Sequence, residues 1–175
     1  GKPSFILVDP VGYERHLLLA ACAARGMLTV ELWSQPYARM LQERMRLTEA
    51  DAQQLRENTA PLHGEEKEWA ACTLGDSKVL GVLCGSDAGL CTAERLQSVL
   101  VPERSNGCNP SRRDKYRMHL ALRKVGLDSA LQTCASSWND AEIFLSQLPS
   151  PLKAVVKARR GQSSLRVGLA TSMLE

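Results

Sequence analysis

The chain has 175 residues and a formal net charge of +3, and 44% of its residues are hydrophobic although only 5% are aromatic. This length allows one large domain or two small ones, each with a core built mainly from Leu, Val and Ala. No apolar run of about 18 residues occurs, so we expect no membrane span. Residues 1–30 resemble strand, helix and strand rather than a signal peptide.

The six cysteines form no CxxC pair and offer no zinc-ligand spacing. We therefore expect reduced thiols and a cytoplasmic protein. The chain begins without a methionine and ends directly after a strand-like run, which suggests a piece of a longer protein.

The first part of the chain alternates strand and helix patterns. "SFILVD" (4–9) is a continuous apolar run, typical of a strand that is buried on both faces. The elements expected after it are helix 12–26, strand 27–33, helices 36–47, 48–58 and 64–75, strand 78–85 and helix 86–100, with 48–58 either separate or a continuation. This alternation predicts an α/β fold, with a Rossmann-like parallel-sheet domain over residues 1–103.

The loop 101–110 contains two prolines, Asn-Gly and Asn-Pro, and marks the domain boundary. A linker with its helix is expected over 104–127, the helix itself over 111–126, with Ser111 and Asp114 resembling a capping box. The remaining residues, 128–175, are predicted to form a small α+β subdomain that is incomplete at its C-terminus. Its expected elements are a strand near 129–135, helix 137–148, strand 152–158 and strand 165–171.

Basic residues are concentrated in two segments of the second part. Between residues 102 and 124 there are seven bases and two acids, and between 151 and 174 there are five bases and no acid. Such an asymmetry indicates a local anion site rather than a generally basic surface.

Two lysines are the candidate anion ligands. Lys115 shares one helical face with Met118, Leu122 and Val125, and a cation in the first turn of a helix is relieved by a nearby anion. A lysine that extends to solvent along the edge of an apolar stripe is the alternative.

Lys157 ends the strand 152–158, directly before the loop "RRGQSS" (159–164). Gly161, Ser163 and Ser164 leave the backbone N–H groups of this loop accessible to phosphate oxygens. A hairpin with a solvated basic face is the alternative interpretation of the same residues.

The order "RRDKYRMHLALRKVGL", a strand and helix, and then "LKAVVKARRGQSSLRVGLA" resembles the ATP-grasp superfamily, closest to its ATP-dependent carboxylate–amine ligases. "VLGVLCGSDAGLCTAERL" resembles the end of that family's N-terminal domain. The resemblance extends over essentially the whole chain. Two departures concern the loop, where Ala158 replaces the usual proline and Leu165 with Arg166 replaces a common glycine.

The resemblance implies that Lys115 and Lys157 contact ATP phosphates and that Gly161, Ser163 and Ser164 belong to a loop that closes over the triphosphate. It also implies an acyl-phosphate mechanism that joins a small carboxylate or amino acid to an amine. The family holds Mg²⁺ on a C-terminal subdomain beyond this chain, so we expect the chain alone to be inactive and no catalytic or metal residue is assigned. A homodimer is left open.

Three other functions are considered. A non-catalytic ATP-binding or interaction module of ATP-grasp type is the alternative. A dinucleotide oxidoreductase is disfavoured because GxGxxG is missing after the first strand. Nucleic-acid binding is disfavoured because the basic segments hold few stacking aromatics. The loop "GSDAG" (85–89) is interpreted as a turn rather than a small-anion site.

Overall fold

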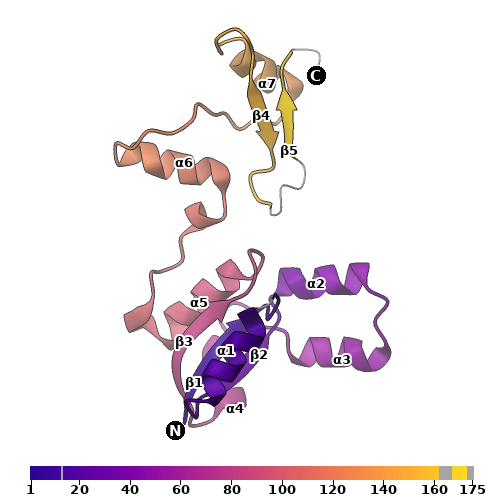
Figure 1. Ribbon diagram of the computed structural model, residues 1–175, viewed down its shortest axis with the longest axis vertical. Helices are drawn as coiled ribbons and strands as arrows, with labels where there is room; N and C mark the ends of the chain where they lie inside the picture. The colour runs from indigo at the N-terminus through magenta and orange to yellow at the C-terminus, as the bar shows by residue number, and fades with distance from the viewer. Residues whose placement is uncertain (13, 162–166, 173–175) are drawn as a thin grey trace. The chain divides into compact units, whose positions relative to one another are not determined.

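The computed structural model describes residues 1–12, 14–161 and 167–172, and the chain divides into two compact units (Figure 1). Unit 1 is Gly1–Cys108 and unit 2 is Asn109–Glu175. Both contain helices and strands, which confirms the α/β class. The division between the units falls within residues 104–127, the segment predicted to be a linker with its helix. No helix in the described ranges has the length and apolarity needed to cross a membrane.

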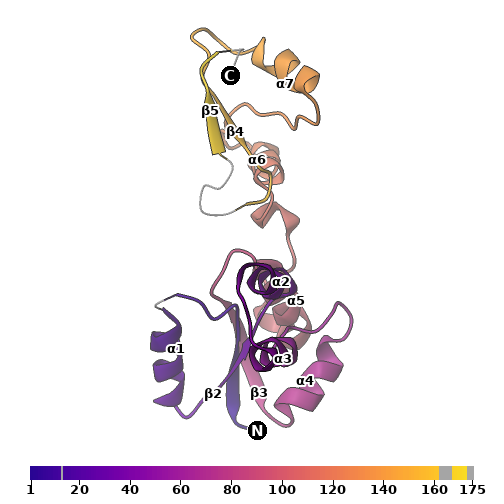
Figure 2. The same ribbon diagram turned by 90° about the vertical axis from the view of Figure 1, so that its right-hand side faces the viewer.

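Unit 1 is built on a three-stranded parallel sheet of order β2–β1–β3. The strands are β1 (Pro3–Val8), β2 (Leu28–Leu32) and β3 (Lys78–Cys84). The helices are α1 (Glu14–Ala23), α2 (Gln35–Arg44), α3 (Glu49–Glu57), α4 (Glu66–Leu74) and α5 (Leu90–Leu100), followed by a 3₁₀ turn, Pro102–Arg104. Figure 2 shows α1 on one side of this sheet and α2 to α5 on the other. The predicted parallel sheet of the first domain is therefore confirmed.

The core of unit 1 lies between the sheet and the side that carries α4 and α5. Ile6 and Val8 of β1 are both fully buried, and Leu96 of α5 packs in the same cluster. Alternation along β1 turns Phe5 and Leu7 to the opposite face, toward α1. The central strand is therefore buried on both faces, as its apolar run predicted.

A capping box decides whether residues 48–58 continue the helix before them or form a separate one. Thr48 accepts a hydrogen bond from the Asp51 backbone N–H at 3.1 Å, and the Asp51 carboxylate accepts from the Thr48 backbone N–H at 3.3 Å. These reciprocal bonds satisfy N–H groups at a new helix start. Helix α3 is consequently separate from α2.

Unit 2 contains two helices and a hairpin among its described residues. These elements are the 3₁₀ turn Pro110–Arg112, α6 (Lys115–Lys124), α7 (Trp138–Leu145), β4 (Ala154–Lys157) and β5 (Val167–Ala170). The two strands pair antiparallel, with Val155 opposite Leu169 and Lys157 opposite Val167. The strand predicted near 129–135 is wrong, because that segment is irregular and pairs with neither β4 nor β5.

The apolar face predicted for α6, with Met118, Leu122 and Val125, is buried only in part. Leu122 is half-buried, but Met118 is 41% exposed and Val125 is 70% exposed. An apolar helical face is buried only where a second layer covers it. The described part of unit 2 provides no such layer over this face.

Candidate functional site

The start of α6 is determined by Asp114. Its side chain accepts a hydrogen bond from the Arg117 backbone N–H at 3.1 Å, so Asp114 is the N-cap residue. The predicted pairing of Ser111 with Asp114 in a capping box is therefore wrong. The residues before Asp114 form a separate 3₁₀ turn, which Asn109 caps by accepting from the Ser111 backbone N–H.

An ion pair between the buried Asp114 and the half-exposed Arg159 joins the start of α6 to the segment after β4. The Asp114 carboxylate, 1% exposed, accepts hydrogen bonds from Arg159 Nη2 at 2.5 Å and from Nε at 3.3 Å. The Arg159 guanidinium also lies 5.8 Å from the ring centroid of Tyr116, within reach of a cation–π interaction. Hydrogen bonds from Arg159 hold the pKa of Asp114 below its ordinary value although burial opposes this.

Lys115 makes two further contacts with the same segment. Its backbone N–H donates to the Arg159 carbonyl at 2.9 Å, and its Nζ donates to the Gly161 carbonyl at 2.9 Å. Residues 46 positions apart in sequence are thus brought together. Two of the predicted site residues, Lys115 and Gly161, are in direct contact.

Lys157 is the last residue of β4 and is exposed. Strand alternation places it on the same face of the hairpin as Val155, opposite Val167. Ser163 and Ser164, the other two predicted residues, lie outside the described residues.

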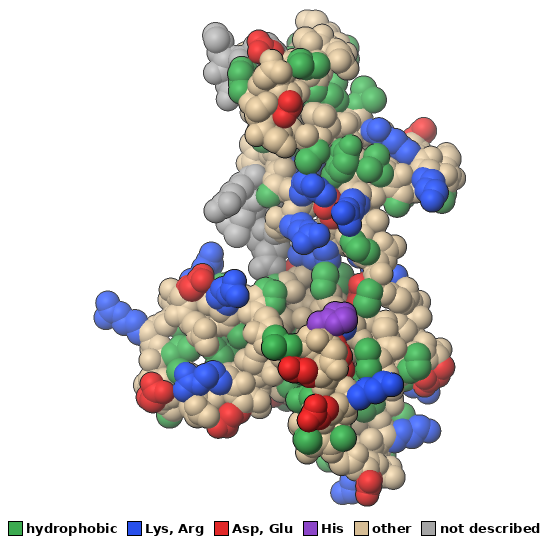
Figure 3. Space-filling view, turned by 180° about the vertical axis from the view of Figure 1, so that it is seen from behind, with side chains coloured by type: hydrophobic (Ala, Val, Ile, Leu, Met, Phe, Trp, Pro, Cys, Tyr) green, Lys and Arg blue, Asp and Glu red, His purple; other side chains and the backbone are tan. Residues whose placement is uncertain are grey.

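The arrangement can bind an anion because no acidic side chain of the described residues pairs with Lys115. Among the described residues its ammonium group contacts one neutral carbonyl, which uses one of its three N–H donors. The charge of Arg159, by contrast, is already paired with Asp114. Figure 3 shows Lys and Arg side chains gathered in the region of α6, where exposed bases outnumber acids.

Sequence reasoning missed the roles of Asp114 and Arg159. One signal was present, because an Asp directly before the run "KYRMHLALRK" is itself a preferred N-cap. The pairing with Arg159 carried no sequence signal, since 45 positions separate the two residues.

In unit 1 the loop 85–89 surrounds the side-chain carboxylate of Asp9. Ser86 Oγ donates to the buried Asp9 carboxylate at 2.5 Å and accepts from the Gly89 backbone N–H at 3.0 Å. Ser34 donates to the same carboxylate from its backbone N–H at 2.6 Å and from its hydroxyl at 2.8 Å. The loop is thus a turn closed around Asp9, as interpreted from the sequence.

Comparison of the chain with protein-family models and with curated proteins gave no match. Within the described ranges, no group of three or more His, Cys, Asp or Glu side chains is placed to hold a metal ion.

Proposed function

We propose that unit 2 binds the phosphates of ATP through Lys115 and Lys157, and that the chain belongs to an ATP-grasp carboxylate–amine ligase. The single observation that carries this proposal is the contact between the Lys115 ammonium and the Gly161 carbonyl. It supports one site made from the start of α6 and the loop after β4. Such a site requires these two segments to be adjacent, and they are far apart in the sequence.

Lysine suits this role because its ammonium group is a mobile point charge with three donors. On ATP binding, Lys115 would transfer a hydrogen bond from the Gly161 carbonyl to a phosphate oxygen. Lys157 would contribute a second charge from the end of β4. Arg159, held by Asp114 and Tyr116, would fix the start of the loop rather than bind phosphate.

In the proposed reaction a substrate carboxylate oxygen attacks the γ-phosphorus of ATP, which forms an acyl phosphate and releases ADP. An amine then attacks the acyl carbon, and phosphate leaves as the amide forms. Phosphoryl transfer of this kind depends on positioning and charge neutralisation. The described residues do not fit a Mg²⁺ site, so the role proposed for this chain is confined to phosphate binding by its lysines.

Isothermal titration of the whole chain with ATP tests the proposal. We expect Lys115→Ala and Lys157→Ala each to lose about 1–3 kcal/mol of binding free energy, as for a charge-assisted hydrogen bond. The matched controls are Lys124→Ala, in the last turn of α6, and Lys153→Ala, before β4, both exposed. An equal loss in the controls would indicate a diffuse charge effect, and unchanged affinity in both site variants would contradict the proposal.

An interaction module of the same fold is the second candidate. It is favoured by the hairpin, where Val155 is 59% exposed and Leu169, directly opposite, is 64% exposed. An exposed apolar pair of this kind is common where another protein surface packs. Val155→Gln with Leu169→Gln would abolish partner binding in that case, and because glutamine adds no charge to the face that carries Lys157, ATP affinity should stay unchanged.

A further inference from the structure

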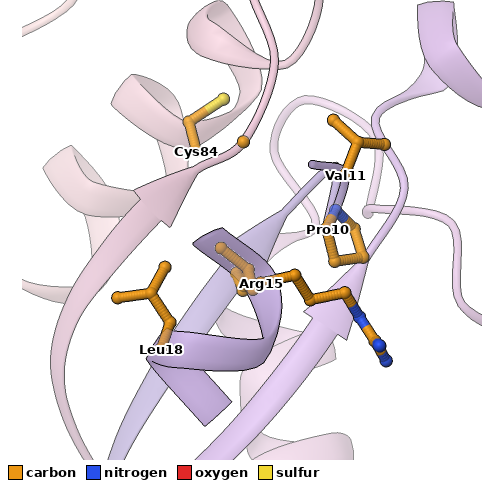
Figure 4. Close-up of a pocket in the computed structure, with 7 residues that line it drawn as sticks. Pro10, Val11, Arg15, Leu18 and Cys84 are labelled. Carbon is orange, nitrogen blue, oxygen red and sulfur yellow. The ribbon is translucent and has the colours of Figure 1, made fainter. Parts of the chain in front are cut away.

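Unit 1 contains a cavity of 210 Å³ at the carboxyl ends of β1 and β3. Leu7 and Pro10 line it from β1 and the loop after it, Leu18 lines it from α1, and Cys84 with Gly85 lines it at the end of β3. Figure 4 shows Pro10 and Leu18 at the cavity, with the thiol of Cys84 directed away from Leu18, so that Cys84 lines the cavity with its backbone. None of them belongs to the candidate site of unit 2, so a ligand of this cavity is independent of the proposed function.

The topology of the sheet marks this position for ligand binding. From the central strand β1 the chain crosses to β2 on one side, whereas β3 lies on the other side. In parallel α/β sheets, ligands bind at the carboxyl ends of strands where the connections diverge in this way. The cavity lies at that point, between β1 and β3.

Hydrogen bonds hold the loops around the cavity in place. Asp9 is fully buried and joins the loop after β1 to Ser34 and Ser86, which follow β2 and β3. The Gly85 backbone N–H also donates to the Val8 carbonyl at 2.9 Å. The cavity is consequently pre-formed, which is usual for small-molecule sites.

Charge and polarity define what the cavity can hold. Arg15 is the only charged residue that lines it in the described structure, and its guanidinium makes a two-point ion pair with Glu31 at 2.6 and 2.7 Å. Figure 4 shows the aliphatic stem of Arg15 beside Pro10, with the guanidinium directed away from Leu18 and Cys84. More of the lining surface is apolar than polar, and a charged ligand would find no free counter-charge among the described lining residues, which makes its desolvation costly.

We propose that this cavity binds a small, uncharged and mainly apolar molecule. An apolar cavity of about 150 Å³ takes up benzene, so 210 Å³ accommodates a single substituted ring or a branched chain of similar size. Leu7, Val11 and Leu18 would contact its apolar surface.

Three probes of matched shape test on the intact chain whether the cavity prefers an uncharged ligand. They are 4-methylphenol, 4-methylbenzoate and 4-methylbenzylamine. Binding is followed by amide chemical shifts and by intermolecular NOEs to the methyl groups of Leu7, Val11 and Leu18. We expect saturable shifts and NOEs at these residues with 4-methylphenol. Both charged probes should bind roughly tenfold more weakly or worse, since neither finds a free counter-charge among the described residues that line the cavity.

Leu18→Trp should fill the cavity and weaken 4-methylphenol binding by roughly tenfold or more. The matched control is Leu17→Trp, because Leu17 is on the same helix, is 57% exposed and does not line the cavity. If Leu18→Trp does not fold, the NOEs of the unmodified chain still decide the matter. Absence of NOEs up to the solubility limit of 4-methylphenol, or equal binding of 4-methylbenzoate, would overturn the proposal.

Discussion

The two units bury their apolar residues to very different extents. In unit 1 the central strand is covered on both faces, and Ile6, Val8 and Leu96 are fully buried. In the described part of unit 2, Ala170 is the single buried hydrophobic residue, and both faces of the hairpin carry exposed valine. The difference teaches that unit 1 derives its stability from a packed core, whereas the described contacts of unit 2 are mainly polar bonds around Asp114 and Arg159.

The largest effect is expected from a substitution in the packed core of unit 1. Leu96→Ala should lower the free energy of unfolding of unit 1 by about 2–5 kcal/mol, because it leaves a void in a closed core. The same substitution in unit 2, Leu169→Ala, should cost about 0.5 kcal/mol or less, since that side chain is 64% exposed. Urea unfolding followed by circular dichroism measures both. Equal losses would show that the two units do not differ in this way.

The next effect concerns the buried polar centre of unit 1. Asp9→Asn should cost about 1–3 kcal/mol, because an amide cannot accept all of the donors that now converge on the carboxylate. Asp9 has φ of 51°, a conformation that Asn tolerates, so backbone strain does not contribute to the loss. Thermal unfolding compared with Asp76→Asn, an exposed control, measures the effect. A loss no larger than that of the control would contradict the role assigned to Asp9.

A smaller effect is expected at the polar centre of unit 2. Asp114→Asn keeps a good N-cap but removes the charge that pairs with Arg159, and should cost about 1 kcal/mol, because Arg159 is 47% exposed and screened. Hydrogen exchange at the Arg117 amide should then be roughly fivefold faster. Asp128→Asn, exposed in the same unit, is the control.

The pH dependence of the same bond has a definite sign. Arg159 lowers the pKa of Asp114, so the stabilisation that the ionised Asp114 gives to the folded state is complete above the unfolded pKa of about 3.9. It is lost as the pH falls through the lower pKa of the folded state. Protection of the Arg117 amide should therefore fall in acid for the wild-type chain and stay flat for Asp114→Asn. If protection of the Arg117 amide changes with pH in the same way in both chains, the Asp114 carboxylate is not responsible for the loss in acid.

The smallest effect on stability is expected at Lys157. Lys157→Ala should change the thermal unfolding of either unit by no more than about 0.5 kcal/mol, because the side chain is exposed at a strand end. Its effect on ATP affinity should nevertheless be large. A substantial loss of stability would mean that this lysine supports the hairpin rather than a ligand.

Unit 1 could be predicted closely from the sequence because its signals are local. The run "SFILVD" and the Gly at position 26 place β1 and the end of α1 within a few residues of where they lie. Apolar strands of this kind are buried wherever helices flank them on both sides. A helical period likewise predicts α5, whose Leu96 is in the core.

Unit 2 was harder to predict because its structure depends on distant partners. The segment 129–135 has strand-like composition, but a strand exists only where another strand pairs with it. The spacing of Met118 and Val125 indicates an apolar face without telling whether anything covers it. Lys115 and Gly161 were both singled out, yet their contact follows from the Asp114–Arg159 pair, which no local pattern predicts.

Three glycines of unit 1 serve two distinct purposes. A Cβ atom on Gly85 would lie 2.3 Å from the Asp9 carbonyl oxygen, and one on Gly89 would lie 2.4 Å from Asp9 Oδ2, so no other residue fits at either position. Gly26 instead has a φ of +67° with open space around it, and asparagine can take its place. A saturation library scored for folded protein should retain glycine alone at 85 and 89 while accepting asparagine at 26, and so separate the glycines that pack against Asp9 from the one that only needs a positive φ.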